Sequence, residues 1–316
     1  MQPAELPTYA VIIGAEKTAT TMIAAALREH PEAEVPAAEF VGFADPNYDE
    51  GTVDELHRQF TRTDVRRRIF KCAAYLGHHE VPERLAADLG DPDLVVIVRN
   101  PIKRAVSAWY WYVRLGFLPP IGHEEGIRQL LEGDLDRKIW RRPHAPTGWD
   151  MRIIGRENVL EWGLYAHQLE HWLAVAPREK VHVLTDLELA EDATAAIQGL
   201  YRSLGLDPAF VPTAHTDRHN SGIYSMRRLR WLRMRLRWTW QQDAQGRWQN
   251  ARPTRPVPAA ANAAFVAVDR YVLARLEPAD APRLTPGLRD ALLAYYDDDI
   301  SKLEQLFRLD LTAWRS

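Results

Sequence analysis

The sequence predicts an α/β fold in which a mostly parallel central sheet is flanked by helices in three layers. Short apolar runs at 9–13, 94–98 and 181–185 have the length and composition of strands that are buried on both faces. Segments with helical periodicity follow these runs. Strands that alternate with helices form right-handed βαβ units, which place the strands parallel in one sheet with helices on both sides.

The other elements follow from the same periodicities and from Gly, Pro and capping residues. Helices are expected at 20–29, 52–60, 81–89, 101–112, 122–139, 165–175 and 192–204. A short strand is expected to end near Lys71, and a turn-rich, aromatic loop to occupy 32–48. These elements make up a sheet with its covering helices.

The last third of the chain has a different character. Arginines are interleaved with Leu and Trp at 227–240, and 241–261 is polar, Pro-rich and without periodicity, which predicts an irregular loop. Two helices, around 263–276 and 286–307, close the chain. We predict a single domain over 1–316, with a core at about 8–210, a lid or loop region at 211–262 and closing helices at 263–316.

Composition limits the kinds of partner. The net charge of −3 gives no overall attraction to nucleic acid or to an anionic membrane, so any anion must be bound by local clusters. The single cysteine, Cys72, excludes an internal disulfide framework and fits a reducing compartment. The first seven residues lack the features of a signal peptide, and no apolar run is expected to span a bilayer. We expect a cytoplasmic, bacterial-style protein without stable membrane insertion.

The segment between the first strand and the first helix predicts an anion site. Gly14 permits a sharp turn, after which a helix points its free N–H groups and positive dipole end into the loop. Lys17 and the hydroxyls of Thr18, Thr20 and Thr21 would strengthen the binding of phosphate or sulfate. The alternative is an ordinary turn with a solvated lysine. The Gly-Lys-Ser/Thr pattern of ATP and GTP loops is not met, because Lys17 follows Glu16.

A second anion site is predicted where the strand at 94–98 ends, in Arg99-Asn-Pro-Ile-Lys-Arg104-Ala-Val-Ser107. Open α/β sheets bind ligands at the carboxyl ends of their strands. An NTPase would be expected to place an Asp here for magnesium, whereas Arg99 favours an anion. Ser107 lies two turns along the next helix, on the face toward the strand end, so Arg99 and Ser107 can bind a second phosphate. The alternative is a set of solvated arginines.

Together, the two motifs resemble those of sulfotransferases that use 3′-phosphoadenosine-5′-phosphosulfate (PAPS). Carbohydrate-type members bind the 5′-phosphosulfate with Ile-Gly-x-x-Lys-x-Gly-Thr-Thr, and Ala19 stands where the family usually has Gly. The family's Arg and Ser contact the 3′-phosphate, which implies these roles for Arg99 and Ser107, while Arg104 is implied to be structural. The resemblance extends to about Leu206 and resumes weakly at 295–314.

This resemblance implies a P-loop-NTPase-like sulfotransferase fold, with PAPS as donor and adenosine 3′,5′-bisphosphate (PAP) as product. No metal is expected, because lysine and backbone donors replace magnesium and the histidines show no zinc-site spacing. Asn220-Ser-Gly222 followed by Arg227 and Arg228 lies where the family usually has a late loop over the 3′-phosphate, which implies a role for one or both arginines. The segment at 230–240 could instead bind an acidic acceptor, lie on a membrane surface, or form a surface helix with its tryptophans toward the core.

Transfer to an alcohol requires removal of the hydroxyl proton and neutralisation of the leaving phosphate. Glu39 is the candidate base, since Glu39-Phe-Val-Gly-Phe43 fits loosely the Glu-x-x-x-Phe setting of carbohydrate-type members. Lys17 and Lys71 are the other catalytic candidates. Lys71-Cys-Ala-Ala-Tyr75 resembles in part the family's Lys-Ser/Thr-Pro-x-Tyr segment, whose Lys lies near the acceptor and the transferred sulfate. The alternatives are a surface glutamate and a lysine that caps a strand end.

The sequence thus predicts an enzyme that moves a sulfuryl group from PAPS to a hydroxyl of a sugar or a small secondary metabolite. One alternative is a P-loop-type nucleotide or small-molecule kinase, which the missing Gly-Lys-Ser/Thr and Arg99 disfavour. The other is a non-catalytic nucleotide-binding protein, which would not need Lys17, Arg99 and Ser107. The walls of the acceptor pocket are expected from 40–48, 123–149 and the arginine-tryptophan segment. None of these segments contains a motif that identifies the acceptor.

Overall fold

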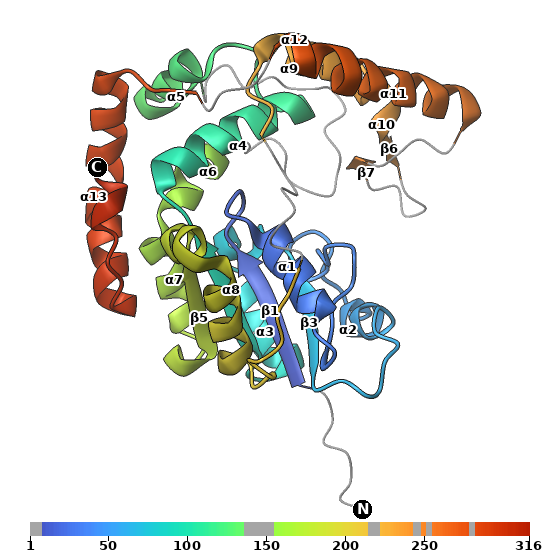
Figure 1. Ribbon diagram of the computed structural model, residues 1–316, viewed down its shortest axis with the longest axis vertical. Helices are drawn as coiled ribbons and strands as arrows, with labels where there is room; N and C mark the ends of the chain where they lie inside the picture. Colours follow the sequence, from blue (N-terminus) through green and yellow to red (C-terminus); the bar gives the residue numbers. More distant parts are fainter. Residues whose placement is uncertain (1–7, 136–154, 214–221, 243–247, 251–254, 278–281) are drawn as a thin grey trace, which may run out of the picture. The chain divides into compact units, whose positions relative to one another are not determined.

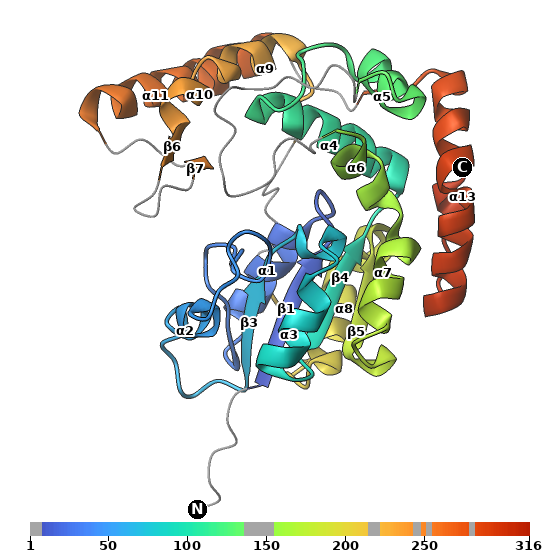
Figure 2. The same ribbon diagram turned by 180° about the vertical axis from the view of Figure 1, so that it is seen from behind.

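A computed structural model of the protein describes residues 8–135, 155–213, 222–242, 248–250, 255–277 and 282–316 (Figures 1 and 2). The chain forms two compact units. The first, the sheet unit, comprises Met1–Pro101, Leu164–Asn220 and Tyr296–Ser316. The second, the helical unit, comprises Ile102–Gly163 and Ser221–Tyr295. The single domain with its subdivision at 210 and 262 stays a prediction.

The sheet unit contains a five-stranded, all-parallel sheet in the order β2-β3-β1-β4-β5. The strands are β1 (Thr8–Gly14), β2 (Ala33–Glu34), β3 (Arg67–Lys71), β4 (Asp93–Val98) and β5 (Val181–Thr185). The predicted parallel α/β sheet is confirmed. Within the sheet, Ile12 of β1 lies opposite Lys71 of β3 and Val95 of β4. The strand ends that bear Gly14, Lys71 and Arg99 therefore meet at one edge of the sheet.

Helices cover both faces of this sheet (Figures 1 and 2). Its helices are α1 (Thr20–Glu29), α2 (Thr52–His57), α3 (Val81–Leu89), α7 (Tyr165–Leu173) and α8 (Asp186–Ser203), with the short helices η1 (Tyr75–Gly77), η4 (Arg178–Lys180) and η7 (Thr312–Trp314). On one face, α1 and α8 pack on the strands through a core that includes Ile12, Leu27, Ile97 and Tyr201. On the other face lie α3 and α7.

The start of α8 differs from the prediction. The helix was expected from residue 192, but it begins at Asp186 behind a capping box in which Thr185 and Glu188 bond each other's backbone N–H groups. At Asp192 the backbone leaves the helical region (φ −151°, ψ 94°), and its carboxylate accepts the N–H of Ala195. Asp192 therefore marks a kink at which a second helical stretch is capped, and this cap resembles a helix start in the sequence.

The helical unit contains most of the remaining helices and a small ribbon. Its elements are α5 (His123–Glu132), α6 (Arg156–Val159), η3 (Glu161–Gly163), α9 (Met226–Arg233), α10 (Leu236–Thr239), β6 (Trp240–Gln242), β7 (Trp248–Asn250), α11 (Pro256–Val268), η6 (Asp269–Leu273) and α12 (Ala274–Leu276). Two helices contain residues of both units, α4 (Pro101–Leu115) and α13 (Pro286–Phe307).

The expected irregular loop at 241–261 is wrong in part. The described residues there include an antiparallel ribbon of β6 and β7, and α11 begins at Pro256. Strands of three residues are too short to show an alternating pattern. Proline at the first position of a helix is a favourable start that the sequence analysis did not use at Pro256.

A second correction concerns the apolar content of the same region. Among the described residues, the helical stretch Pro256–Leu276 is long and apolar enough to cross a membrane by length and composition alone, and 6% of its most apolar window is buried. The expectation that no apolar run reaches this length is therefore wrong. The sequence analysis assigned the first part of this stretch to a loop at 241–261 and the rest to a helix at 263–276, so neither element had the full length.

A closed set of hydrogen bonds fixes the turn that follows β4. The side-chain amide of Asn100 donates to the carbonyl of Trp314 (2.8 Å), and the N–H of Asn100 donates to Asp186 Oδ2 (3.3 Å). The indole Nε1 of Trp314 donates to Asp186 Oδ1 (2.8 Å). Trp314 is buried, so the end of the chain holds the backbone beside Arg99 in place.

Replacing Trp314 by Phe tests this anchor. The substitution retains a buried ring but leaves Asp186 without its indole donor, so the free energy of unfolding should fall by about 1–3 kcal/mol. Urea denaturation monitored by circular dichroism measures the change. Tyr271→Phe, at a residue that is 57% exposed, is the control and should stay within about 0.5 kcal/mol of the wild type. Equal stabilities of Trp314→Phe and the control would contradict the anchor.

Candidate active site

The loop between β1 and α1 has the shape of an anion cradle. Its first N–H, that of Ala15, donates to the carbonyl of Ile97 in β4 (2.9 Å), and the hydroxyl of buried Thr18 donates back to the carbonyl of Ala15 (2.6 Å). Lys17 and Ala19 both adopt left-handed backbone conformations, with φ of 71° and 75°. Ala19 is the N-cap of α1 and has no side-chain group to bond the first N–H groups of the helix. This helix start can therefore receive an anion.

Gly14 is required by close packing. A Cβ atom built on Gly14 would lie 2.6 Å from Cβ of Leu76 and 3.4 Å from the carbonyl oxygen of Ala73. Because no side chain fits there, the segment after β3 can pack directly on the end of β1. The turn at Gly14 and the segment that begins at Lys71 are thus held together.

Lys71 joins the predicted catalytic residues to the cradle. Its Nζ lies 2.8 Å from Oε1 of Glu39 and donates to the hydroxyl of Thr21 at 3.3 Å. The Lys71 side chain is 11% exposed, whereas that of Glu39 is 43% exposed. The structure therefore brings Glu39, Lys71 and Thr21 together, with Lys71 in the inner position and Glu39 accessible to solvent.

Tyr75 holds the loop that contains Glu39. Its buried hydroxyl donates to the carbonyl of Phe40 and accepts the N–H of Phe43 (3.2 Å). Burial raises the pKa of Tyr75, so the phenol stays protonated and able to donate. The N–H of Phe40 in turn donates to the carbonyl of Lys71 (2.9 Å). These bonds fix the backbone next to Glu39, a role that the sequence analysis did not assign to Tyr75.

One expectation about the lining of this region needs correction. Phe40 and Phe43 are buried and pack against Phe70, with ring centroids 5.9 Å apart in each pair, so these two aromatic residues belong to the core instead of lining an acceptor pocket. Burial also raises the pKa of the Cys72 thiol, which therefore stays protonated and inert at neutral pH.

Arg99 lies at the end of β4, beside the cradle. Its Nη1 donates to the carbonyl of Lys17 (3.3 Å), and its own carbonyl accepts the hydroxyl of Tyr165 (2.9 Å). The predicted cationic groups Lys17 and Arg99 are therefore contributed by neighbouring loops of the sheet unit.

The other residues of the predicted 3′-phosphate motifs belong to the helical unit. Ser107 is half-buried on α4, and Arg104 is fully buried there, where it donates to the carbonyls of Val159 (3.0 Å) and Asn158 (2.6 Å). The structural role expected for Arg104 is confirmed. The roles expected for Ser107, Arg227 and Arg228 stay predictions.

Both late arginines have acidic partners. Arg228 donates to both carboxylate oxygens of Asp269 (2.9 and 3.0 Å), and Arg227 Nη1 lies 3.2 Å from Glu277. Asn220 and Ser221, part of the expected late loop, lie outside the described residues, as do 136–149 of the expected pocket wall.

One cluster was missed by the sequence analysis. The exposed side chains of His79, His167 and His171 lie together in the sheet unit. His167 and His171 are four residues apart on α7, a spacing that places both on one helix face and was a usable signal. Desolvation and the neighbouring His79 and His167 lower the pKa of His171. The expectation that the histidines show no metal-site spacing is wrong for this pair.

Comparisons with known proteins show which family this chain resembles. The family model described as "Sulfotransferase domain" matches residues 7–216. Human heparan sulfate glucosamine 3-O-sulfotransferase 3B1 is 26% identical over 223 residues, which cover 68% of this chain and 49% of the relative. The bifunctional heparan sulfate N-deacetylase/N-sulfotransferase 1 of Caenorhabditis briggsae is 28% identical over 212 residues, which cover 65% of this chain and 23% of the relative.

The fold is also found in a solved structure. A sulfotransferase from Alicyclobacillus acidocaldarius superposes with a TM-score of 0.63 at 21% identity, over 98% of this chain and 99% of that chain. This match confirms the predicted sulfotransferase fold. The chain itself spans about half the length (49%) of the human relative it matches.

Ala19→Gly tests the backbone of the cradle. A left-handed backbone costs a non-glycine residue about 1–2 kcal/mol, and glycine at this position removes that cost. The greater flexibility of glycine in the unfolded chain opposes this stabilisation by about 0.5–1 kcal/mol. The substitution should therefore raise the free energy of unfolding by up to about 1.5 kcal/mol. Ala25→Gly, inside α1, is the control and should lower it by about 0.5–1 kcal/mol. A fall in both variants, measured by thermal unfolding, would contradict the conformation of Ala19.

Proposed function

The chain belongs to the sulfotransferase family, and on this premise we propose that it is an enzyme that transfers a sulfuryl group from PAPS to an acceptor hydroxyl. The products are PAP and a sulfate ester. The observation that supports this proposal most is the position of Lys71, which contacts both Glu39 and the cradle residue Thr21. These contacts support a mechanism in which the proposed acid–base group lies beside the proposed anion site.

The donor is assigned to the two loops at the carboxyl edge of the sheet. The cradle at 14–21 binds the 5′-phosphosulfate through Lys17, the hydroxyls of Thr20 and Thr21, and the N–H groups at the start of α1, while the Thr18 hydroxyl holds the loop in shape through the carbonyl of Ala15. Arg99 binds the 3′-phosphate, and the family motif adds Ser107 to it. These groups carry positive charge or donate hydrogen bonds, as a donor with phosphates at both ends requires.

In the transfer itself, Glu39 acts as the general base. Its carboxylate takes the proton of the acceptor hydroxyl while the hydroxyl oxygen attacks sulfur. The bond between sulfur and the bridging phosphate oxygen breaks, and PAP leaves with its electron pair. Lys17 and the N–H groups of α1 stabilise the negative charge on the leaving phosphate, and Lys71 stabilises the charge on the transferred group.

The acceptor is proposed to be a hydroxyl of a sugar or a small molecule. Two of the relatives are named for heparan sulfate, one for transfer to glucosamine oxygen and one for N-sulfotransfer. These names favour a carbohydrate acceptor. The 43% exposure of Glu39 supports an acceptor that reaches the base from solvent.

Glu39→Gln tests the base. The amide retains the size of the side chain but cannot accept a proton, so kcat should fall by about 10²–10⁴-fold with little change in PAP affinity. Transfer from radiolabelled PAPS, measured across a panel of sugars and small alcohols, gives the rate, and calorimetry gives the affinity. Glu50→Gln, at an exposed loop carboxylate, is the matched control and should have wild-type activity. Wild-type turnover in Glu39→Gln would remove Glu39 from the mechanism.

Nucleotide binding tests the donor and separates this proposal from a kinase. PAP should raise the melting temperature, whereas ATP with magnesium should give a much smaller shift. Lys17→Ala removes a charge-assisted contact worth about 1.5–3 kcal/mol, so PAP should bind about 10–100-fold more weakly. Lys302→Ala, on α13, is the matched lysine control and should bind PAP normally. Stronger binding of ATP than of PAP, or equal PAP affinity in Lys17→Ala and the control, would contradict the donor assignment.

A further inference from the structure

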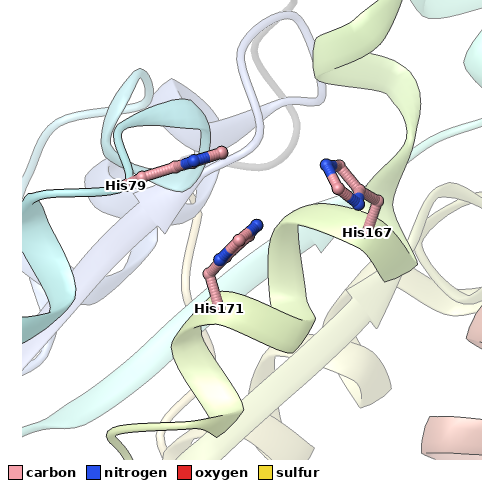
Figure 3. Close-up of side chains that lie close together, drawn as sticks. All are labelled: His79, His167 and His171. Carbon is pink, nitrogen blue, oxygen red and sulfur yellow. The ribbon is translucent and has the colours of Figure 1, made fainter.

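Three histidines from two separate segments of the sheet unit form a compact group (Figure 3). His79 follows η1 and precedes α3, and His167 and His171 lie on one face of α7. Each side chain can offer a ring nitrogen, and these nitrogens all lie within 4.8 Å of one another. All three residues are exposed, so an ion can reach them directly from solvent.

The rings are arranged closely. His79 and His171 are stacked, with ring centroids 4.1 Å apart and an angle of 26° between the rings. His167 lies edge-on to both, at 5.3 Å from His171 and 6.3 Å from His79. Three imidazole side chains thus lie on one small surface. They would repel one another when protonated, and when neutral they can bind one cation together.

The segments that bear the histidines are fixed by other contacts. The indole Nε1 of Trp172, on α7, donates to the carbonyl of Leu76 in η1 (3.2 Å). Asp299 accepts the N–H groups of Ala166 (3.0 Å) and His167 (2.9 Å) at the start of α7. The two segments therefore stay together without the histidines, and the cluster is preorganised for a ligand.

A polar partner at the edge of the cluster also suits a metal ligand. Nε2 of His79 lies 3.3 Å from Oε1 of Gln168, whose side chain is buried on α7. Metal-binding histidines commonly donate their second ring N–H to such an oxygen, which fixes the tautomer and the ring orientation. Binding of a metal through Nδ1 of His79 keeps this hydrogen bond.

We propose that His79, His167 and His171 bind a divalent transition-metal ion, with Zn²⁺ as the preferred ion. Imidazole nitrogens suit Zn²⁺, and three protein ligands leave the fourth tetrahedral position to water. Zn–N bonds of about 2.0–2.1 Å place the ligating nitrogens of a tetrahedral site about 3.3 Å apart. The ring nitrogens now lie within 4.8 Å of one another, and rotations of these exposed side chains can bring them to this distance.

The ion would join α7 to the segment between η1 and α3. The same segments lie next to the donor loops, because the first residue of α7, Tyr165, bonds the carbonyl of Arg99, and Leu76 packs on Gly14. The site is therefore assigned to stabilisation of the sheet unit, since a ligand that binds only the folded protein shifts the unfolding equilibrium. This assignment does not depend on the proposed transfer reaction.

Titration of the tag-free, chelator-treated full chain with ZnCl₂ tests the proposal. We expect one Zn²⁺ per chain by calorimetry, and at a hundredfold excess over Kd a rise in melting temperature of about 4 °C. Co²⁺ should give the visible absorption bands of a tetrahedral nitrogen site. His79→Ala, His167→Ala and His171→Ala should each weaken Zn²⁺ binding by about tenfold or more.

His57→Ala is the matched control, because His57 is an exposed histidine on α2, outside the cluster, and this variant should bind Zn²⁺ as the wild type does. Melting temperatures without metal show whether each variant is folded, and His171→Gln provides a second substitution of similar size. Equal Zn²⁺ affinities in the wild type and all cluster variants, or no binding at micromolar protein, would overturn the proposal.

Discussion

The parallel register of three strands determines what this protein can do. Because Ile12 lies opposite both Lys71 and Val95, β1, β3 and β4 end at one edge, and the residues that follow them meet there. Each strand end contributes one cationic side chain, of Lys17, Lys71 or Arg99. Cations at this edge would repel one another in isolation, so the arrangement favours a ligand with several negative charges. A chain with a net charge of −3 can therefore still gather three cationic side chains at one edge of its sheet.

The surrounding structure mainly restricts the backbone at that edge. Gly14 lets the segment after β3 approach the end of β1, Tyr75 fixes the loop that bears Glu39, and Asp186 with Trp314 fixes the turn beside Arg99. Each contact is buried or partly buried, where a hydrogen bond left without its partner is costly. The side chain of Glu39 can therefore be exposed while its main chain stays in place, which is the condition for a preorganised site.

The sequence predicted the strands β1, β4 and β5 and the helices α3, α7 and α13 well, because continuous apolar runs and regular periodicity are local signals. The turn between β1 and α1 was also predicted from consecutive residues, whereas the binding of an anion by this turn stays a prediction. The pairing of Glu39 with Lys71 and the grouping of His79 with α7 depend on tertiary packing, and no local pattern states them. The cap at Thr185 and the helix start at Pro256 are local signals that the sequence analysis did not use. A second cap at Asp192 and the polar, Pro-rich composition of 241–261 favoured other assignments there.

The central claim is that one doubly phosphorylated adenosine nucleotide binds across the ends of β1 and β4. A crystal structure of the protein with PAP measures this directly. We expect the 5′-phosphate within hydrogen-bond distance of Lys17 and the first N–H groups of α1, and the 3′-phosphate on Arg99. A 5′-phosphate bound away from this loop, or a 3′-phosphate that does not contact Arg99, would contradict the account.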